Sequence, residues 1–270
     1  MAKVIAVCNQ KGGVGKTTTS INLSACLSAA ERRTLIIDMD PQSNATTGLG
    51  FDKSKIDFSI YDVLTDRSED SERITIDKIK LKCDSIKYLD LAPATPDLAG
   101  AEIELVNAIA REKKLCDAIN AVRDQYDYII IDSPPSLGLL TVNVLTAADA
   151  VLIPIQCEYY ALEGLAELLN TIRLVQKNLN SKLVIEGALM TMYDGRLNLS
   201  RQVAEDVRSC FQGRVFEVVI TRNVKLSEAP SFGKPIILYD IMSSGAENYL
   251  TLAKEIMQNE QTKPTQESIG

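Results

Sequence analysis

The stretch Lys11-Gly-Gly-Val-Gly-Lys-Thr-Thr18 decides the fold, because it has the composition of a phosphate-binding loop. It follows the apolar run Val4 to Cys8, which is typical of a buried strand. It leads into Thr17 to Ala30, which has helical character. Glycines let the loop backbone surround an anion, and the amino terminus of the helix adds unpaired amides and partial positive charge. Strand, loop and helix together predict a site for a polyphosphate.

The loop carries two lysines, and only one stands in the usual position. The common pattern needs a glycine where this chain has Gln10, and it places its lysine at Lys16 and its magnesium-binding hydroxyl at Thr17. Thr18 is expected to lie near the α-phosphate. From the pattern alone, the extra Lys11 is either a solvent-exposed charge or a second phosphate contact. The residues predicted to hold the nucleotide are Lys11, Gly12, Gly13, Val14, Gly15, Lys16, Thr17 and Thr18.

The bulk composition is that of an ordinary globular chain. Its 270 residues are 46% hydrophobic and 24% charged, which suits one large α/β domain. We expect a single domain over residues 1–258 and a disordered polar tail over residues 259–270. No apolar run approaches the roughly 20 residues of a membrane span, and no signal peptide precedes the first strand, so a cytoplasmic protein is expected.

Histidine is absent, and its absence limits the chemistry. Ser-His-Asp triads and His-ligated zinc are excluded, so catalysis must rest on carboxylates, lysines and a metal. The six cysteines have no CxxC spacing, and we expect buried free thiols. A net charge of −7 argues against coating nucleic acid through the overall field, so any DNA contact requires a local basic patch.

Apolar runs alternate with helical patterns along the chain. Strands are predicted at residues 4–8, 34–37, 88–91, 128–131, 150–155, 184–192 and 215–220. Helical spacing follows the first strand and recurs at residues 98–125, 162–179, 200–211 and 246–258. This alternation predicts a three-layer α/β fold, with a mostly parallel twisted sheet and helices on both faces. The charged, irregular residues 52–86 are interpreted as a surface excursion between strands.

Carboxylates end two of the predicted strands, where open parallel sheets bind their ligands. Asp132 follows the apolar run Tyr128 to Ile131 in the manner of a Walker B element, so we expect it to hold Mg²⁺ through water. Asp38 and Asp40 follow the second strand. Taken singly, each aspartate is equally well explained as a turn former or a helix cap.

The loop resembles the deviant phosphate loop of the ParA/MinD/nitrogenase iron-protein class of ATPases. Longer stretches resemble the chromosomal ParA/Soj partition ATPases: DMDPQSNATTGLG (38–50), LAGAEIEL (98–105), DYIIIDSPPSLGLLTVNVLTAAD (127–149), PIQCEYYALEGL (154–165) and NVKLSEAPSFGKPIILYD (223–240). The resemblance implies hydrolysis of ATP to ADP and phosphate with Mg²⁺. It implies that Lys11 reaches across a nucleotide-sandwiched dimer to the partner's phosphates. It also implies that Asp40 orients or activates the attacking water, with Asp38 in a structural role.

The same resemblance implies DNA and a protein as partners. ATP closes a homodimer, the dimer binds DNA without sequence preference on the nucleoid, and a ParB-like centromere-binding protein stimulates hydrolysis and release. Arg196 and Arg222 match positions where the family places DNA-contacting charge, and Arg201 and Lys225 are plausible neighbours. Each of the four is otherwise explained as a solvated surface charge.

Two departures from the family pattern concern its turns. The family usually has Pro-Arg-Asn beside the adenine where this chain has Thr221-Arg222-Asn223, so Asn223 keeps its amide for the base while Thr221 loses the rigid ring. The first helix usually ends near a glycine, which Ala29 to Arg33 lacks. We expect a different turn there.

Two other functions compete with DNA segregation. One is a membrane-surface positioning ATPase of the MinD kind, but residues 262–270 have no apolar face that could bind a membrane, so no membrane partner is expected. The other is a phosphate-loop ligase or kinase acting on a small molecule, for which Lys11 has no evident task. A DNA-segregation ATPase is therefore the leading prediction.

Overall fold

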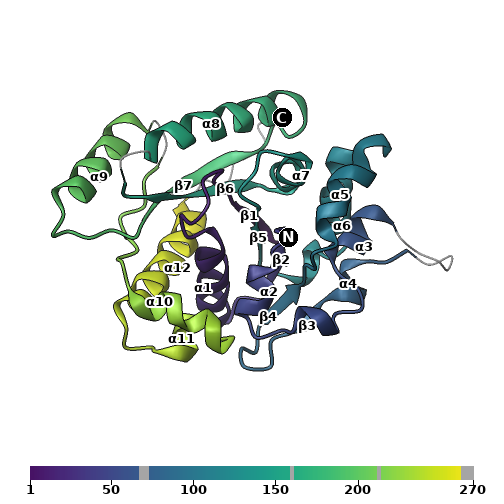
Figure 1. The fold of residues 1–270 in the computed structure, drawn as a ribbon, viewed down its shortest axis with the longest axis horizontal. Helices are drawn as coiled ribbons and strands as arrows, with labels where there is room; N and C mark the ends of the chain where they lie inside the picture. The colour runs from purple at the N-terminus through teal and green to yellow at the C-terminus, as the bar shows by residue number, and fades with distance from the viewer. Residues whose placement is uncertain (67–72, 159–160, 212–213, 263–270) are drawn as a thin grey trace.

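The computed structural model describes residues 1–66, 73–158, 161–211 and 214–262, and a seven-stranded sheet lies at its centre (Figure 1). The strand order is β3-β4-β2-β5-β1-β6-β7, and every pair is parallel except β3 with β4. The strands are β1 (Lys3–Val7), β2 (Thr34–Asp38), β3 (Leu81–Lys82), β4 (Leu89–Ala92), β5 (Tyr128–Asp132), β6 (Ala150–Gln156) and β7 (Val184–Thr191). The predicted three-layer α/β class is confirmed.

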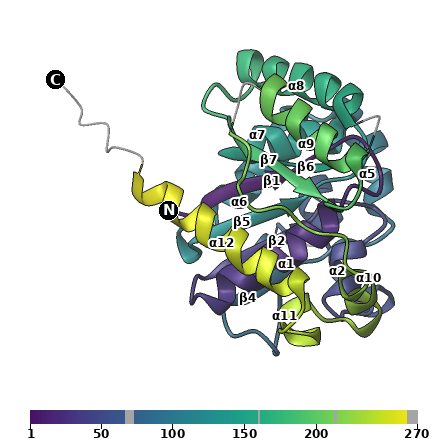
Figure 2. The ribbon, with the colours of Figure 1, turned by 90° about the vertical axis from the view of Figure 1, so that its left-hand side faces the viewer.

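Helices cover both faces of the sheet (Figures 1 and 2). On one face α1 and α12 lie side by side, and on the other lie α3, α5, α6, α7 and α8. Their bounds are α1 (Lys16–Ala29), α2 (Asn44–Gly48), α3 (Ile60–Thr65), α4 (Ile76–Ile79), α5 (Leu98–Glu104), α6 (Lys114–Asn120), α7 (Leu139–Ala147), α8 (Ala161–Asn178), α9 (Asn198–Cys210), α10 (Val224–Glu228), α11 (Ile236–Tyr239) and α12 (Ser244–Thr262).

The central strand β1 shows why these runs are apolar throughout. Successive side chains of a strand point to opposite faces, and both faces are covered by helices. Ile5 and Val7 pack with α1 and α12, whereas Val4 and Ala6 pack with the helices of the other face. A strand with two buried faces needs apolar residues at every position, which the run after Lys3 supplies.

The predicted strand over residues 215–220 is wrong, although this segment does lie beside β7. It makes only two isolated bridges within the described chain, Ala188 to Val215 and Tyr193 to Thr221. The ladder is interrupted because the Glu255 carboxylate accepts the backbone N–H of Val218 at 2.8 Å. A side chain of α12 thus takes a donor that a further parallel strand beside β7 would need.

The predicted helix over residues 98–125 is also wrong, because the chain breaks it into α5, α6 and three 3₁₀ turns (Leu105–Asn107, Arg111–Lys113 and Arg123–Gln125). Ala110 adopts a left-handed φ of 52°, which ends helical geometry there. On the other side of the break, Asn143 of α7 accepts the backbone N–H of Leu115 at 3.3 Å. Before the break, Leu98, Ala101 and Leu105 form a short buried face, whereas Ile103, Val106 and Ile109 are exposed. The buried face therefore ends before residue 110 and does not continue into α6.

Three further segments differ from expectation. Residues 52–86 are more than a surface excursion, because α3 begins at a capping box formed by Ser59 and Asp62 and buries Ile60 completely. Helix α12 runs to Thr262, past the expected start of the tail, and residues 263–270 lie outside the described residues. After α1 the chain still makes a turn with a left-handed residue, although it has no glycine there, because Glu31 adopts φ of 59°. The expectation of a different turn is therefore wrong.

Candidate nucleotide-binding site

The phosphate-binding loop joins the carboxyl end of β1 to the start of α1, as predicted. Gly13 and Gly15 adopt φ of 73° and 89°, a region that side-chain-bearing residues rarely occupy. A Cβ added at Gly12 or Gly13 would meet no atom within 4 Å, so the loop borders open space. Thr191, at the end of β7, donates its hydroxyl to the carbonyl of Val14 at 2.8 Å. This bond fixes the buried side of the loop.

Lys16 lies at the base of the loop with only 7% of its surface exposed. Its Nζ donates to the carbonyl oxygen of Lys11 at 3.1 Å, and among the described residues no carboxylate oxygen lies within 4.0 Å of it. Burial lowers the pKa of Lys16, and the negative charge of Asp132 is the main opposing effect. A buried ammonium with one carbonyl partner is suited to a phosphate, which would supply the missing negative charge.

Lys11 contributes its backbone and its side chain to different contacts. Its backbone N–H donates to Oδ1 of Asn9 at 3.0 Å, and Asn9 is anchored in turn to the carbonyl of Pro154 at 2.7 Å. Its Nζ lies 3.6 Å from the Glu158 carboxylate, and both side chains are partly exposed. Within one chain the extra lysine is therefore ion-paired at the surface beside the loop.

Asp132 is the last residue of β5 and is in register with Asp38, the last residue of the neighbouring strand β2. The Ser20 hydroxyl donates to Asp132 Oδ1 at 2.9 Å, whereas Oδ2 is buried without a hydrogen-bond partner. Burial, followed by the charge of Asp38, raises the pKa of Asp132 to about 8, against the effect of the Thr17 and Ser20 hydroxyls. An orphaned carboxylate oxygen beside Thr17 fits a hydrated magnesium ion, which the sequence predicted for these two residues.

The two aspartates after β2 have different surroundings. Asp38 is fully buried and accepts the N–H and hydroxyl of Thr46 at 2.9 and 2.7 Å and the N–H of Asp40 at 3.1 Å. Burial nevertheless raises the pKa of Asp38 to about 6. These contacts agree with the structural role expected of it. Asp40 is 7% exposed and accepts the N–H of Gln42 at 3.0 Å, so its predicted action on water stays a prediction.

A cavity of about 530 Å³ opens beside the loop. Gly15 and Thr18 line it from the loop side, and Thr221 and Asn223 line it from the other side. Its size is within the roughly 300–1,000 Å³ range of small-molecule sites, and it lies where a nucleoside would extend from phosphates in the loop. The structure therefore brings Asn223 to the same cavity as the loop.

The amide of Asn223 is already occupied by contacts within the protein. Its Oδ1 accepts the N–H of Lys225 at 2.8 Å, which caps α10, and its Nδ2 donates to Ser244 at 2.9 Å. Thr221 donates both its N–H and its hydroxyl to Oδ1 of Asn248, at 3.1 and 3.0 Å. A proline could provide neither donor, so in this chain the threonine ties the cavity wall to α12 instead of stiffening it.

Sequence reasoning missed three residues at this site. Ser20 lies one helical turn after Lys16, and this i, i+4 spacing was the available signal. Thr191 had no recognisable signal, because its contact with the loop joins residues 177 apart. Met192 lines the cavity with a left-handed φ of 51°, a strained backbone that no sequence pattern marks.

The four candidate DNA-contacting residues fall into two groups. Arg196 is highly exposed and donates to Asp194 at 2.9 and 2.7 Å, and together with the charge of Arg222 it lowers the pKa of Asp194 to about 2. The structure thus brings Arg196 and Arg222 together. Arg201 on α9 instead donates to Asn198, and Lys225 on α10 lies 3.2 Å from Glu228. Throughout the described residues, no helix is long and apolar enough to cross a membrane.

Comparison with known proteins places the chain among bacterial partitioning proteins. A family model described as an AAA domain matches residues 2–185. The sporulation initiation inhibitor protein Soj of Bacillus subtilis is 60% identical over 96% of this chain and 100% of its own length. The chromosome partitioning protein ParA of Myxococcus xanthus is 54% identical over 100% of this chain and 93% of its own length.

Solved structures share the fold over nearly the whole chain. Cobyrinic acid a,c-diamide synthase from Mycobacterium smegmatis, with bound ADP and magnesium, has a TM-score of 0.84 and 37% identity and covers 97% of this chain and 96% of its own. The cell division ATPase MinD of Pyrococcus furiosus has a TM-score of 0.76 and 25% identity, covering 96% of this chain and 100% of its own.

Proposed function

This chain belongs to the ParA/Soj family of chromosome-partitioning ATPases, and we propose that it is an ATP-dependent DNA-segregation ATPase. One observation in the described part of the chain carries the proposal. Beside one loop lie the buried Lys16, which has no carboxylate partner there, and the buried Oδ2 of Asp132, which has no hydrogen-bond donor there. ATP with Mg²⁺ would satisfy both groups at once. Lys16 alone could bind any anion and Asp132 alone could bind any cation, so neither group by itself indicates a nucleotide.

Each residue of the loop has a task in binding ATP. The backbone amides of Gly12 to Gly15 would hold the phosphates, Lys16 would neutralise their charge, and Thr18 would contact the α-phosphate. The Thr17 hydroxyl and, through water, Asp132 would hold Mg²⁺, which would supply positive charge to neutralise the phosphates. The neighbouring cavity would take the nucleoside, with Asn223 at its wall.

Hydrolysis would rest on Asp40, because the chain has no histidine. Asp40 follows the strand end at which Asp38 is held by Thr46, and its N–H donates to Asp38 at 3.1 Å. The buried Asp38 therefore fixes the backbone from which Asp40 extends. A carboxylate held in this way would orient the attacking water beside the γ-phosphate.

A dimer is proposed because, in the part of the chain that the structure describes, the Lys11 side chain has no contact with the phosphate-binding site of its own chain. Among the described residues, its Nζ is held only by a partly exposed ion pair with Glu158, and such pairs are worth about 0–1 kcal/mol. Exchange of this carboxylate for the phosphates of a partner subunit's ATP would join two chains through their nucleotides. The dimer would then double the basic surface of Arg196 and Arg222, which favours ATP-dependent binding to non-specific DNA. A ParB-like protein would stimulate hydrolysis and release the DNA.

Sedimentation with ATP, with ADP and without nucleotide, each with and without non-specific DNA, tests this proposal. The chain should dimerise and sediment with DNA only with ATP, and Lys11→Ala should bind ATP but stay monomeric. Lys55→Ala is the matched control, because Lys55 is also an exposed lysine in an ion pair, with Asp52 at 3.5 Å. Dimerisation of Lys11→Ala equal to that of the control, or DNA binding without regard to nucleotide, refutes it.

One observation favours a second function, a small-molecule synthase. The likeness to cobyrinic acid a,c-diamide synthase extends over nearly the full chain at 37% identity. The identity to Soj and ParA proteins is higher, at 60% and 54%, which favours segregation. Measurement of ADP release separates the two functions. A segregation ATPase responds to DNA and a ParB-like protein, whereas an amide-forming synthase responds to a carboxylic acid together with an ammonia source.

A further inference from the structure

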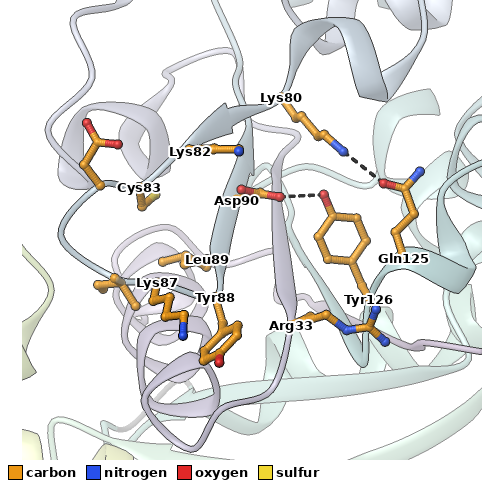
Figure 3. Close-up of a pocket in the computed structure, with 12 residues that line it drawn as sticks. Arg33, Lys80, Lys82, Cys83, Lys87, Tyr88, Leu89, Asp90, Gln125 and Tyr126 are labelled. Carbon is orange, nitrogen blue, oxygen red and sulfur yellow. Dashed lines mark hydrogen bonds between the residues drawn. The ribbon is translucent and has the colours of Figure 1, made fainter.

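Figure 3 shows a second hollow, of about 410 Å³. It lies at the opposite end of the sheet from the phosphate-binding loop. Arg33, Tyr88 and Tyr126, which line it, come just before the starts of β2, β4 and β5, while the loop and its carboxylates lie at strand ends. The connection between β3 and β4 forms another wall. No residue of this hollow takes part in the nucleotide site.

Cationic side chains are concentrated around the hollow, in a chain that is acidic overall. Four cationic side chains, Arg33, Lys80, Lys82 and Lys87, line it, against two carboxylates, Asp84 and Asp90. The net charge of the whole chain is −7. Asp77 and Asp127 pair with Lys80 and Arg33 beside the hollow, so the charges around it balance. An anion would therefore be held by individual lysines and not by a net positive field.

Two of the four cations have charge available for a ligand. Lys80 is bound to Asp77 at 2.6 Å and to Gln125 at 2.9 Å, and Arg33 is paired with Asp127 at 3.4 Å. Lys82 is exposed and makes no ion pair among the described residues. Lys87 is exposed too, and its Nζ lies 4.9 Å from the centre of the Tyr88 ring. These two lysines can turn toward an anion without breaking an ion pair.

The rest of the lining is apolar and aromatic. Cys83, Ile86 and Leu89 are buried and line the hollow. The ring of Tyr126 is buried, and its hydroxyl donates to Asp90 at 2.8 Å, which holds both side chains in place. A bare anion would satisfy the lysines but leave this surface uncovered. A planar apolar group would cover it.

We propose that this hollow binds a small anion that carries a planar ring, of the kind and size of a nucleoside monophosphate. Its phosphate would contact Lys82 and Lys87, its ring would lie against Tyr126 and the apolar residues, and Asp90 would accept a hydrogen bond from a ligand hydroxyl or amine. The volume is within the roughly 300–1,000 Å³ range of small-molecule sites. An acidic peptide is disfavoured, because the adjoining edge strand β3 offers only Leu81 and Lys82 for main-chain pairing.

Calorimetry on the full chain, with the nucleotide site saturated by ADP and Mg²⁺, tests the proposal. The probes are adenosine monophosphate, guanosine monophosphate, inorganic phosphate and a glutamate-rich peptide. One of the two nucleotides should bind once per chain, more tightly than phosphate or the peptide. Lys82→Glu and Lys87→Glu should each weaken it at least about tenfold, since each replaces an attractive charge by a repulsive one.

Lys53→Glu is the control, because Lys53 is an exposed lysine that does not line the hollow. Both tested lysines are exposed, so their variants should keep the fold, which the far-ultraviolet spectrum checks. Tyr126→Phe, which keeps the ring, should retain nucleotide binding. The proposal is overturned if neither nucleotide binds, if phosphate or the peptide binds as tightly, or if both charge reversals behave like the control.

Discussion

Replacement of Ser20 by alanine should uncouple Mg²⁺ from nucleotide binding. Ser20 is fully buried on α1, and its hydroxyl lies 2.9 Å from Asp132 Oδ1 and 3.0 Å from the carbonyl oxygen of Lys16. The other carboxylate oxygen, Oδ2, accepts no hydrogen bond. Ser20→Ala therefore leaves Asp132 without the donor that fixes its orientation, while the loop backbone and Lys16 stay unchanged.

The size of the effect follows from the kind of bond that is lost. A hydrogen bond to a charged group contributes about 1.5–3 kcal/mol. At about 1.4 kcal/mol for each factor of ten, this corresponds to roughly 10- to 150-fold in an equilibrium constant. Because Asp132 would act on the metal and not on the phosphates directly, the loss should fall on the tightening of ADP binding by Mg²⁺. Binding of ADP without Mg²⁺ should change little.

Calorimetric titration of ADP with and without Mg²⁺ measures that tightening directly. Ser24→Ala is the matched control, because Ser24 is also buried on α1, one turn further on, and its hydroxyl has no hydrogen-bond partner. The control should tighten ADP binding with Mg²⁺ as the unmodified chain does. Equal tightening in Ser20→Ala and Ser24→Ala would refute the role of Ser20. So would an equal loss of affinity with and without Mg²⁺, which would indicate damage to the loop.

Three further predictions concern the reaction, the DNA and the pH. Asp40→Ala should bind ATP and dimerise but hydrolyse it slowly, and an unchanged single-turnover rate would contradict its role with water. Arg222→Glu should weaken ATP-dependent DNA binding in gel shifts at matched salt while sparing the dimer, whereas Arg173→Glu, an exposed arginine on α8, should not. Burial raises the pKa of Asp132 to about 8 in the folded chain, whereas the unfolded chain keeps the ordinary value of about 4. Protonation of Asp132 therefore favours the folded state, and this contribution to stability is complete below about pH 4 and lost as the pH rises through 8. The nucleotide-free chain should therefore melt lower at about pH 9 than at about pH 6, and Asp132→Asn should flatten this dependence in thermal unfolding.

The loop and its strand could be predicted because their signals are local. Gly13 and Gly15 need positive φ, Lys16 follows them directly, and the apolar run before them is a strand with both faces buried. The aspartate at the end of β5 was equally predictable, since a parallel sheet brings strand ends to one edge. In each case neighbouring residues in the sequence determine the structure.

The errors arose where distant side chains decide the backbone. Glu255 of α12 takes the N–H of Val218, and this contact over 37 residues turns an apolar run into an irregular segment. Asn143 of α7 likewise accepts the N–H of Leu115 after the break in the expected long helix. Neither contact has a local signature, because Glu255 and Asn143 are ordinary helical residues in sequence. The capping box that begins α3, by contrast, could have been read from Ser59 and Asp62.

The charged groups of the site explain why nucleotide and metal should bind together. Lys16 is buried with a lowered pKa, and Asp132 is buried close by with a raised one, so burial disfavours the charged form of each. A phosphate alone would pair with Lys16 but bring more negative charge toward Asp132. A magnesium ion alone would pair with Asp132 but repel Lys16. Only the two together neutralise both groups, so each should raise the affinity of the site for the other, and this coupling passes through the carboxylate that Ser20 orients.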